Sequence, residues 1–101
     1  MEDKKLRKAI DEYGKEMEEE IILLSNSSFD KSIIGMTEDC RIVYDYEKMI
    51  HEFMEDEQCD EIEAIEWLEH NTLPAIGYMG DRRPIIVYTN KEELLDKYVG
   101  E

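Results

Sequence analysis

The sequence contains no long apolar segment. No run of eighteen apolar residues occurs, and the first residues do not form a charged stretch followed by an apolar one. A membrane-spanning helix needs about 20 apolar residues, and a secretory signal needs an apolar region behind a basic start. The sequence therefore predicts a cytoplasmic protein, or one that is delivered into a cytosol.

Cysteine is scarce, because only Cys40 and Cys59 are present. Their spacing matches neither a Cys-x-x-Cys redox motif nor the paired ligands of a zinc site. Two reduced thiols are the interpretation that this pattern favours, and they fit a reducing compartment.

Motifs for catalysis and metal binding are also lacking. The chain has no nucleophile elbow, no Ser/His/Asp order and no glycine loop that would hold a phosphate. His51 and Glu52 resemble the first half of the His-Glu-x-x-His zinc motif, but Glu55 stands where the second histidine belongs. Residues 56–66 lack the glycine at the sixth position of a calcium loop. We therefore expect no enzymatic activity, no cofactor and no metal site.

Apolar residues are nevertheless abundant and periodic. They make up 42% of the 101 residues, and nine of them are aromatic. A chain of this length with periodic apolar positions can bury one core without disulfides. We expect a single folded domain over residues 1–101.

Negative charge is concentrated in one quarter of the chain. Residues 45–70 contain eleven acidic residues and one lysine, which is −10 of the formal net charge of −15. Such a field repels phosphate, so direct binding of nucleic acid is not expected. It attracts basic surfaces, and this attraction weakens as salt rises.

Apolar spacing in the first quarter of the chain predicts a helix from about Asp3 to Leu24. The stripe consists of Leu6, Ile10, Tyr13, Met17 and Leu24. Gly14 within it predicts a bend or fraying. Residues 21–24 are apolar on all sides, and periodicity leaves open whether they form a buried helix end or an early strand.

The next elements read as a β-hairpin followed by two helices. Ser32–Thr37 and Arg41–Tyr44 have strand composition, and Gly35 predicts a bulge. Asp45 stands at the N-cap position of a helix that runs to Asp56, and Asp60 forms a capping box with Glu63 at the start of a second helix. The short link predicts that the two helices are antiparallel or steeply crossed neighbours. The second helix is expected to stop at Asn71, with a short helical turn from Thr72 and a packed loop behind it.

The remaining elements complete an α+β fold. Pro84–Tyr88 is the clearest strand, and it is expected to join the hairpin because a lone strand cannot satisfy its backbone. Asn90 and Glu93 form a capping box for a last helix through Tyr98. The predicted order is an N-terminal helix, a β-hairpin, two short antiparallel helices, a third strand joining the hairpin and a C-terminal helix.

The outer faces of the two central helices form the candidate partner-binding site. Its residues are Glu47, Glu55, Asp56, Glu57, Asp60, Glu63, Glu66 and Glu69. Trp67 is expected in the core, although its position at the border of the acidic face would make it an anchor if it were exposed. Arg82 and Arg83 are expected to pair with carboxylates of these helices, with a contact to a partner as the alternative.

Several short motifs resemble those of an uncharacterised family of small acidic proteins from Firmicutes and their phages and prophages. They are Val43–Tyr46 (Val-Tyr-Asp-Tyr), Glu63–Trp67 (Glu-Ala-Ile-Glu-Trp), Asn71-Thr72, Tyr78–Gly80 (Tyr-Met-Gly) and Pro84–Val87 (Pro-Ile-Ile-Val). The chain departs from the pattern between Leu73 and Gly77, where Pro74 interrupts a helical turn. The resemblance implies a fold and a phage-linked setting, and no mechanism.

Two functions remain as hypotheses. The first is an acidic protein-binding module that inhibits or regulates a basic nucleic-acid-binding host protein, of the anti-CRISPR or nucleic-acid-mimic type. Carboxylates one helical turn apart lie about 5–6 Å from each other, which is comparable to phosphate spacing. An acidic face that only keeps the protein soluble is the competing interpretation. The second function is a homodimeric structural or assembly protein that pairs through the stripe of the first helix.

Overall fold

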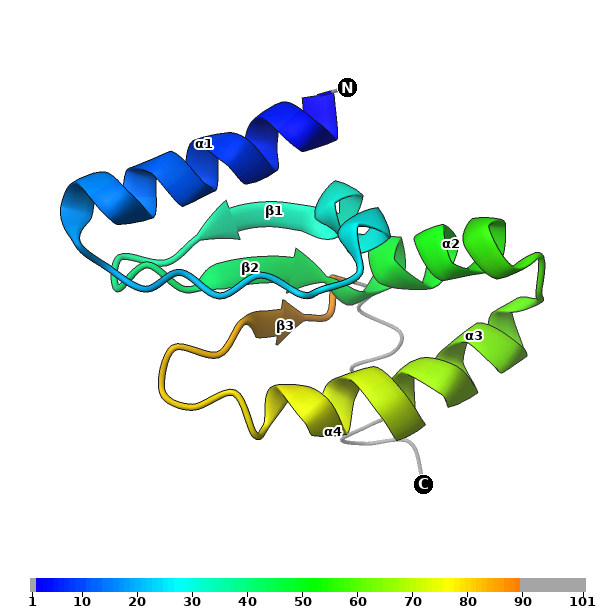
Figure 1. The fold of residues 1–101 in the computed structure, drawn as a ribbon. Coiled ribbons are helices and arrows are strands. Elements are labelled where there is room, and N and C mark those ends of the chain that lie inside the picture. Colours follow the sequence, from blue (N-terminus) through cyan, green and yellow to red (C-terminus); the bar gives the residue numbers. More distant parts are fainter. Residues whose placement is uncertain (1, 90–101) are drawn as a thin grey trace.

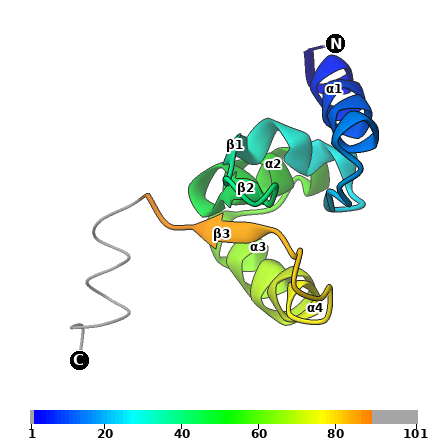
Figure 2. The same ribbon diagram turned by 90° about the vertical axis from the view of Figure 1, so that its left-hand side faces the viewer.

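The computed structural model describes residues 2–89, in which helices surround a small three-stranded sheet (Figures 1 and 2). The elements are α1 (Glu2–Met17), the 3-10 helix η1 (Ser27–Ser32), β1 (Ile33–Met36), β2 (Ile42–Asp45), α2 (Tyr46–Glu57), α3 (Glu61–Trp67), the π-helical turn η2 (Leu68–Thr72), α4 (Leu73–Ile76) and β3 (Ile85–Val87). Figure 1 shows α1 beyond the β1 edge of the sheet and the α3–α4 helix beyond its β3 edge. The predicted helix at 90–98 lies outside the described residues.

The sheet has the order β1-β2-β3. The predicted hairpin of β1 and β2 is present, and its register shifts between Ile33 and Gly35, which confirms the bulge predicted at Gly35. The third strand joins the hairpin as expected, and β3 runs parallel to β2 with Val43 opposite Ile85. A parallel neighbour requires a long crossover, and α2, α3 and α4 supply it.

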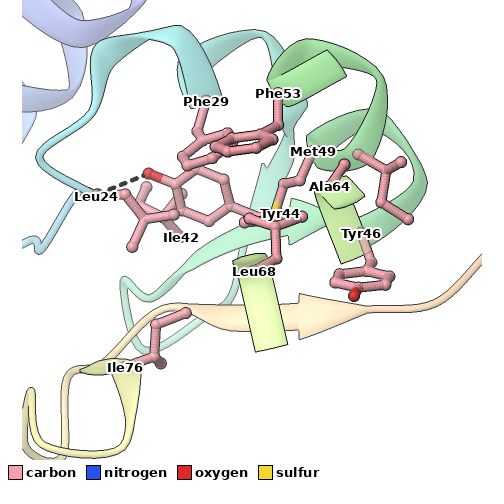
Figure 3. Close-up of a cluster of buried hydrophobic side chains, with 11 residues drawn as sticks. Leu24, Phe29, Ile42, Tyr44, Tyr46, Met49, Phe53, Ala64, Leu68 and Ile76 are labelled. Atoms are coloured by element: carbon pink, nitrogen blue, oxygen red, sulfur yellow. Dashed lines mark hydrogen bonds between the residues drawn. The ribbon is translucent and has the colours of Figure 1, made fainter. Parts of the chain in front are cut away.

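The core lies between the sheet, η1 and the crossover helices (Figure 3). Its largest fully buried side chains include Tyr44, Tyr46 and Met49. The hydroxyl of Tyr44 accepts a hydrogen bond of 2.9 Å from the backbone N–H of Leu24. This bond ties residues 21–24, which form neither helix nor strand, to the central strand.

The first helix ends at Met17, so the prediction that it reaches Leu24 is wrong. Glu18 has a positive φ of 55°, and the N–H groups of Glu18 and Glu19 donate to the carbonyls of Lys15 and Gly14. This pair of bonds is a Schellman motif, which terminates a helix. Gly14 makes room for the reversal, because a Cβ there would lie 3.0 Å from the carbonyl oxygen of Glu19.

Asp45 precedes α2 as predicted but does not cap it with its side chain. Instead its carboxylate accepts a 2.8 Å hydrogen bond from the hydroxyl of Thr89, next to the end of β3. Asp45 is buried, and its carboxylate stabilises the contact with the segment after β3 rather than the start of α2.

The second crossover helix was expected to stop at Asn71, with a separate helical turn from Thr72. The turn is present as α4, but the helix continues into it without a break. The π turn η2 joins α3 to α4, and the N–H of Leu73 donates to the carbonyl of Leu68 five residues earlier. Pro74 has no N–H and its ring crowds the carbonyl four residues before it, so a wider turn is a physical solution for a helix that carries this proline. The chain therefore stays helical to Ile76.

Candidate protein-binding face

The eight predicted site carboxylates all lie on α2, α3, η2 or the link between α2 and α3. Seven of them are exposed, and Glu47 is half-buried. Glu47 lies in the first turn of α2 and Glu57 in the last, so they are separated by about 15 Å along the axis at 1.5 Å per residue. The structure therefore gathers the carboxylates of residues 55–63 at the corner between α2 and α3, while Glu47 lies at the far end of α2 and Glu66 and Glu69 lie towards the far end of the α3–η2 helix.

The corner between these helices is built by two local motifs. Gln58 adopts a left-handed conformation with φ of 54° and ends α2. Asp60 then starts α3, because its carboxylate accepts a 2.9 Å bond from the N–H of Glu63 while the Glu63 carboxylate accepts from the N–H of Asp60. The predicted capping box is therefore confirmed.

Cations within residues 2–89 do not neutralise this acidic face. The ion pairs found there are Arg7 with Asp30, Lys31 with Glu52 and Arg82 with Glu19, and none includes a predicted site carboxylate. Arg82 was expected to pair with the acidic helices, but Glu19 follows α1 in the chain. Arg83 donates to the carbonyl of Gly80 within its own loop. No cation in the described part of the chain therefore pairs with the site carboxylates, whose negative field can act on solvent or on a partner.

A groove of about 620 Å³ opens beside this corner. We call it the Trp67 groove, and its lining residues are Asn26, Phe53, Glu57, Cys59, Glu63, Glu66, Trp67, His70 and Asn71. Three of the eight predicted carboxylates line it, and none of the lysines and arginines within residues 2–89 does. The groove thus combines negative charge with an aromatic wall.

Trp67 is 43% exposed, so its expected place in the core is wrong. Its ring stacks on the buried Phe53 with the centroids 4.7 Å apart and an interplanar angle of 25°. One face of the indole is therefore fixed by the protein. An exposed aromatic ring held in this way is the kind of group that anchors protein–protein contacts.

The π turn shapes the wall of the groove. The Nδ1 of His70 lies 2.8 Å from the carbonyl oxygen of Glu66, and the side-chain amide of Asn71 donates to the carbonyl of Trp67 at 3.0 Å. Both contacts join a side chain to a carbonyl one turn earlier in the helix. They also hold His70 and Asn71 against the helix that carries Trp67.

A smaller apolar pocket of about 200 Å³ continues from the Trp67 groove. The two share Asn26, Trp67 and Asn71. Its further lining includes Leu24, Phe29 and Met79. A ligand lying along α3 would therefore meet carboxylates first and apolar side chains beyond the indole.

The thiol of Cys59 has a raised pKa. Burial raises its pKa, and the carboxylates of Glu63, Asp60 and Glu57 raise it further. The thiol therefore stays protonated, which makes it a poor nucleophile and a poor metal ligand. Among residues 2–89, no three His, Cys, Asp or Glu side chains are grouped to hold a metal ion.

Sequence reasoning placed the acidic face but missed parts of the groove. Asn26, Phe53 and Asn71 carried no signal, because their proximity arises from packing between segments far apart in the chain. The described part of the chain includes no helix that is both long and apolar enough to cross a membrane.

No protein-family model matches this sequence, and no curated protein or solved structure is significantly similar to it. The interpretation of the site therefore rests on its own geometry and charge.

Proposed function

We propose that the protein is an acidic protein-binding module without catalytic activity, which acts in the cytoplasm as a phage-linked inhibitor or regulator of a basic nucleic-acid-binding host protein. It would belong to the anti-CRISPR or nucleic-acid-mimic type. The observation that carries this proposal is the Trp67 groove, which is lined by a half-exposed indole and by three carboxylates that form no ion pair within residues 2–89.

Charge supports a basic partner. The net charge of −15 gives a long-range attraction to a positively charged surface, and it speeds encounter with such a surface at low salt. Nucleic-acid channels are lined with lysine and arginine that normally contact phosphates. Carboxylates at an α-helical spacing offer these side chains an alternative set of acceptors.

The aromatic wall supports specificity beyond simple charge attraction. An arginine that reaches Glu63 or Glu66 can also stack on the exposed face of Trp67, which adds a cation–π contact. Such a contact depends on geometry, so it distinguishes the groove from a uniformly acidic surface that only confers solubility.

The test compares two triple charge reversals. The groove variant carries Glu57→Lys, Glu63→Lys and Glu66→Lys, and the control carries Glu12→Lys, Glu38→Lys and Asp81→Lys at exposed sites elsewhere. Both change the net charge equally. Capture from bacterial lysate at about 50 and 500 mM salt, followed by competition with single-stranded DNA, would be measured for each variant.

We expect the wild type and the control variant to retain a nucleic-acid-binding protein that salt releases and DNA displaces, and the groove variant to lose it. Equal capture by both variants would mean that total charge alone attracts proteins, and it would reject the proposal. A pull-down without any nucleic-acid-binding protein would also reject it.

A further inference from the structure

The apolar stripe of α1 is only partly covered by the domain. Leu6, Tyr13 and Met17 lie on one stripe and are 37%, 42% and 53% exposed. The helix is held to the domain on another side, through Arg7, which bonds to Asp30, and through Gly14, which packs against residues 19–21. Ile10 of the same stripe packs against the core, so Leu6, Tyr13 and Met17 are the stripe residues that stay accessible within residues 2–89.

An apolar cleft of about 330 Å³ adjoins this stripe, between α1 and the edge strand β1. Its lining residues are Leu6, Ile10, Ile33, Ile34, Gly35, Met36 and Ile42, and none of them is charged. Ile34 and Met36 of the edge strand are also exposed. Exposed apolar side chains and an apolar cleft therefore lie side by side on this surface. In a two-fold dimer the side chains of one copy can fill the cleft of the other.

We infer that a second copy of this chain covers this surface, with the two α1 helices packed antiparallel about a two-fold axis. An axis that passes between residues 11 and 12 places Met17 of the second copy opposite Leu6, at the mouth of the cleft. The same axis places Tyr13 opposite Ile10. The apolar stripe is therefore in register with itself.

The charges along α1 fit the same arrangement. Lys5, Glu12 and Glu16 lie within about 40° of one another at 100° per residue, on one flank of the stripe. In an antiparallel pair the same flanks face each other, so Lys5 of one copy lies within about 3 Å along the axis of Glu16 of the other. The same register brings Glu12 of the two copies close together, whereas a parallel pair would hold Lys5 and Glu16 about 16 Å apart along the axis.

The highly acidic face does not oppose this association. Figure 1 shows α1 and α3 at opposite sides of the sheet, so two copies that meet through α1 keep their α2–α3 corners apart. Repulsion between charges farther apart than about 8–10 Å is largely screened at physiological salt. An apolar contact also persists in high salt, whereas binding through the Trp67 groove does not.

The first experiment is sedimentation equilibrium of the full chain from about 5 µM to 1 mM, at 0.15 and 0.5 M salt. We expect a mass that rises from 12.0 kDa towards twice that value at both salt concentrations. Met17→Glu should weaken the dimer at least tenfold, and Ile62→Glu, which adds the same charge at an exposed site on α3, should leave it unchanged. A monomer at every concentration would overturn the inference, as would a dimer that tolerates Met17→Glu.

The second experiment fixes the direction of the helices. Lys5→Glu and Glu16→Lys should each weaken the dimer, and the double variant should restore it. The two residues are eleven positions apart, about 16 Å along one helix, so this rescue can only act between copies. Failure of the double variant to restore the dimer would overturn the antiparallel arrangement. Failure of the groove variants described above would leave this result untouched.

Discussion

Trp67 stacks on Phe53 with ring centroids 4.7 Å apart, and this contact joins α3 to the C-terminal half of α2. Phe53 is buried and Trp67 is not, so the pair passes from the core to the surface. The indole is thereby a fixed part of the groove wall rather than a loose surface side chain.

We expect Trp67→Phe to change the free energy of unfolding by less than about 1 kcal/mol, because a phenyl ring preserves the stack. Trp67→Ala should cost about 2 kcal/mol, which is below the 3–5 kcal/mol of a fully buried aromatic residue because the indole is half-exposed. Urea unfolding followed by far-ultraviolet circular dichroism gives both values. Equal losses in the two variants would show that the stack contributes nothing to the folded state.

Arg7 fastens α1 to the domain. Its guanidinium donates to both carboxylate oxygens of the buried Asp30, at 2.8 and 2.9 Å, and to the carbonyl of Leu24 at 2.7 Å. Arg7→Ala should cost about 2–3 kcal/mol, less than a fully buried pair because one third of the Arg7 side chain is exposed. Adding Asp30→Asn should recover part of this loss in thermal unfolding. The expected cause of the loss in Arg7→Ala is that the buried Asp30 carboxylate loses its ion-pair partner. A double variant less stable than Arg7→Ala alone would contradict this cause.

Tyr44 should make the protein sensitive to alkaline pH. Burial raises the pKa of Tyr44 to about 12, so the folded chain keeps this proton between pH 10 and 12 while the unfolded chain releases it. The contribution of Tyr44 to the free energy of unfolding is fully present below pH 10. It falls by up to about 2–3 kcal/mol as the pH rises to 12. The measurement is urea unfolding at pH 9 and 11.5.

The matched variants are Tyr44→Phe and Tyr78→Phe. Tyr44→Phe removes the acceptor of the Leu24 N–H and should cost about 1–3 kcal/mol at pH 8, yet it should flatten the loss above pH 10. Tyr78 is 91% exposed, so its replacement should leave the pH dependence as in the wild type. An unchanged alkaline loss in Tyr44→Phe would contradict the assignment.

The sign of the stability change in Gly14→Ala tests whether Gly14 has a packing role. Alanine is better than glycine within a helix by about 1 kcal/mol, so a glycine without a packing role would be improved by the change. At this position the new Cβ would lie 3.0 Å from the carbonyl oxygen of Glu19 and 3.3 Å from a side-chain carbon of Ile21. We expect a net loss of about 1–2 kcal/mol, measured by thermal unfolding. A gain in stability would show that Glu19 and Ile21 can move away from the new Cβ without a cost in free energy.

Much of the local structure was predictable because its signals lie within a few residues. The bulge at Gly35, the capping box of Asp60 with Glu63 and the strand at 85–87 follow from composition and spacing. The position of the acidic face was predictable for the same reason, since helical periodicity separates carboxylates from apolar residues.

The errors occurred where a distant segment outweighed a local signal. Apolar residues 21–24 extended the predicted first helix, but Leu24 bonds to Tyr44 and the chain reverses over Gly14. Asp45 has the composition of a helix cap, but Thr89 binds its carboxylate. Tyr44 and Thr89 lie far from Leu24 and Asp45 in the sequence, so no local pattern contained these two bonds. The turn that ends α1 is local, but its signal, Gly14, was interpreted as a bend or fraying within a longer helix.

The sequence by itself determined which segments become helices and strands and where the negative charge is carried, because propensity, capping and periodicity act over one or two turns. Only the tertiary structure brought Asn26 and Phe53 to Trp67 and left the indole half-exposed above three carboxylates. A groove is a relation between surfaces, and burial depends on what packs from elsewhere in the chain. Packing between distant segments therefore formed the Trp67 groove beside the acidic helix face.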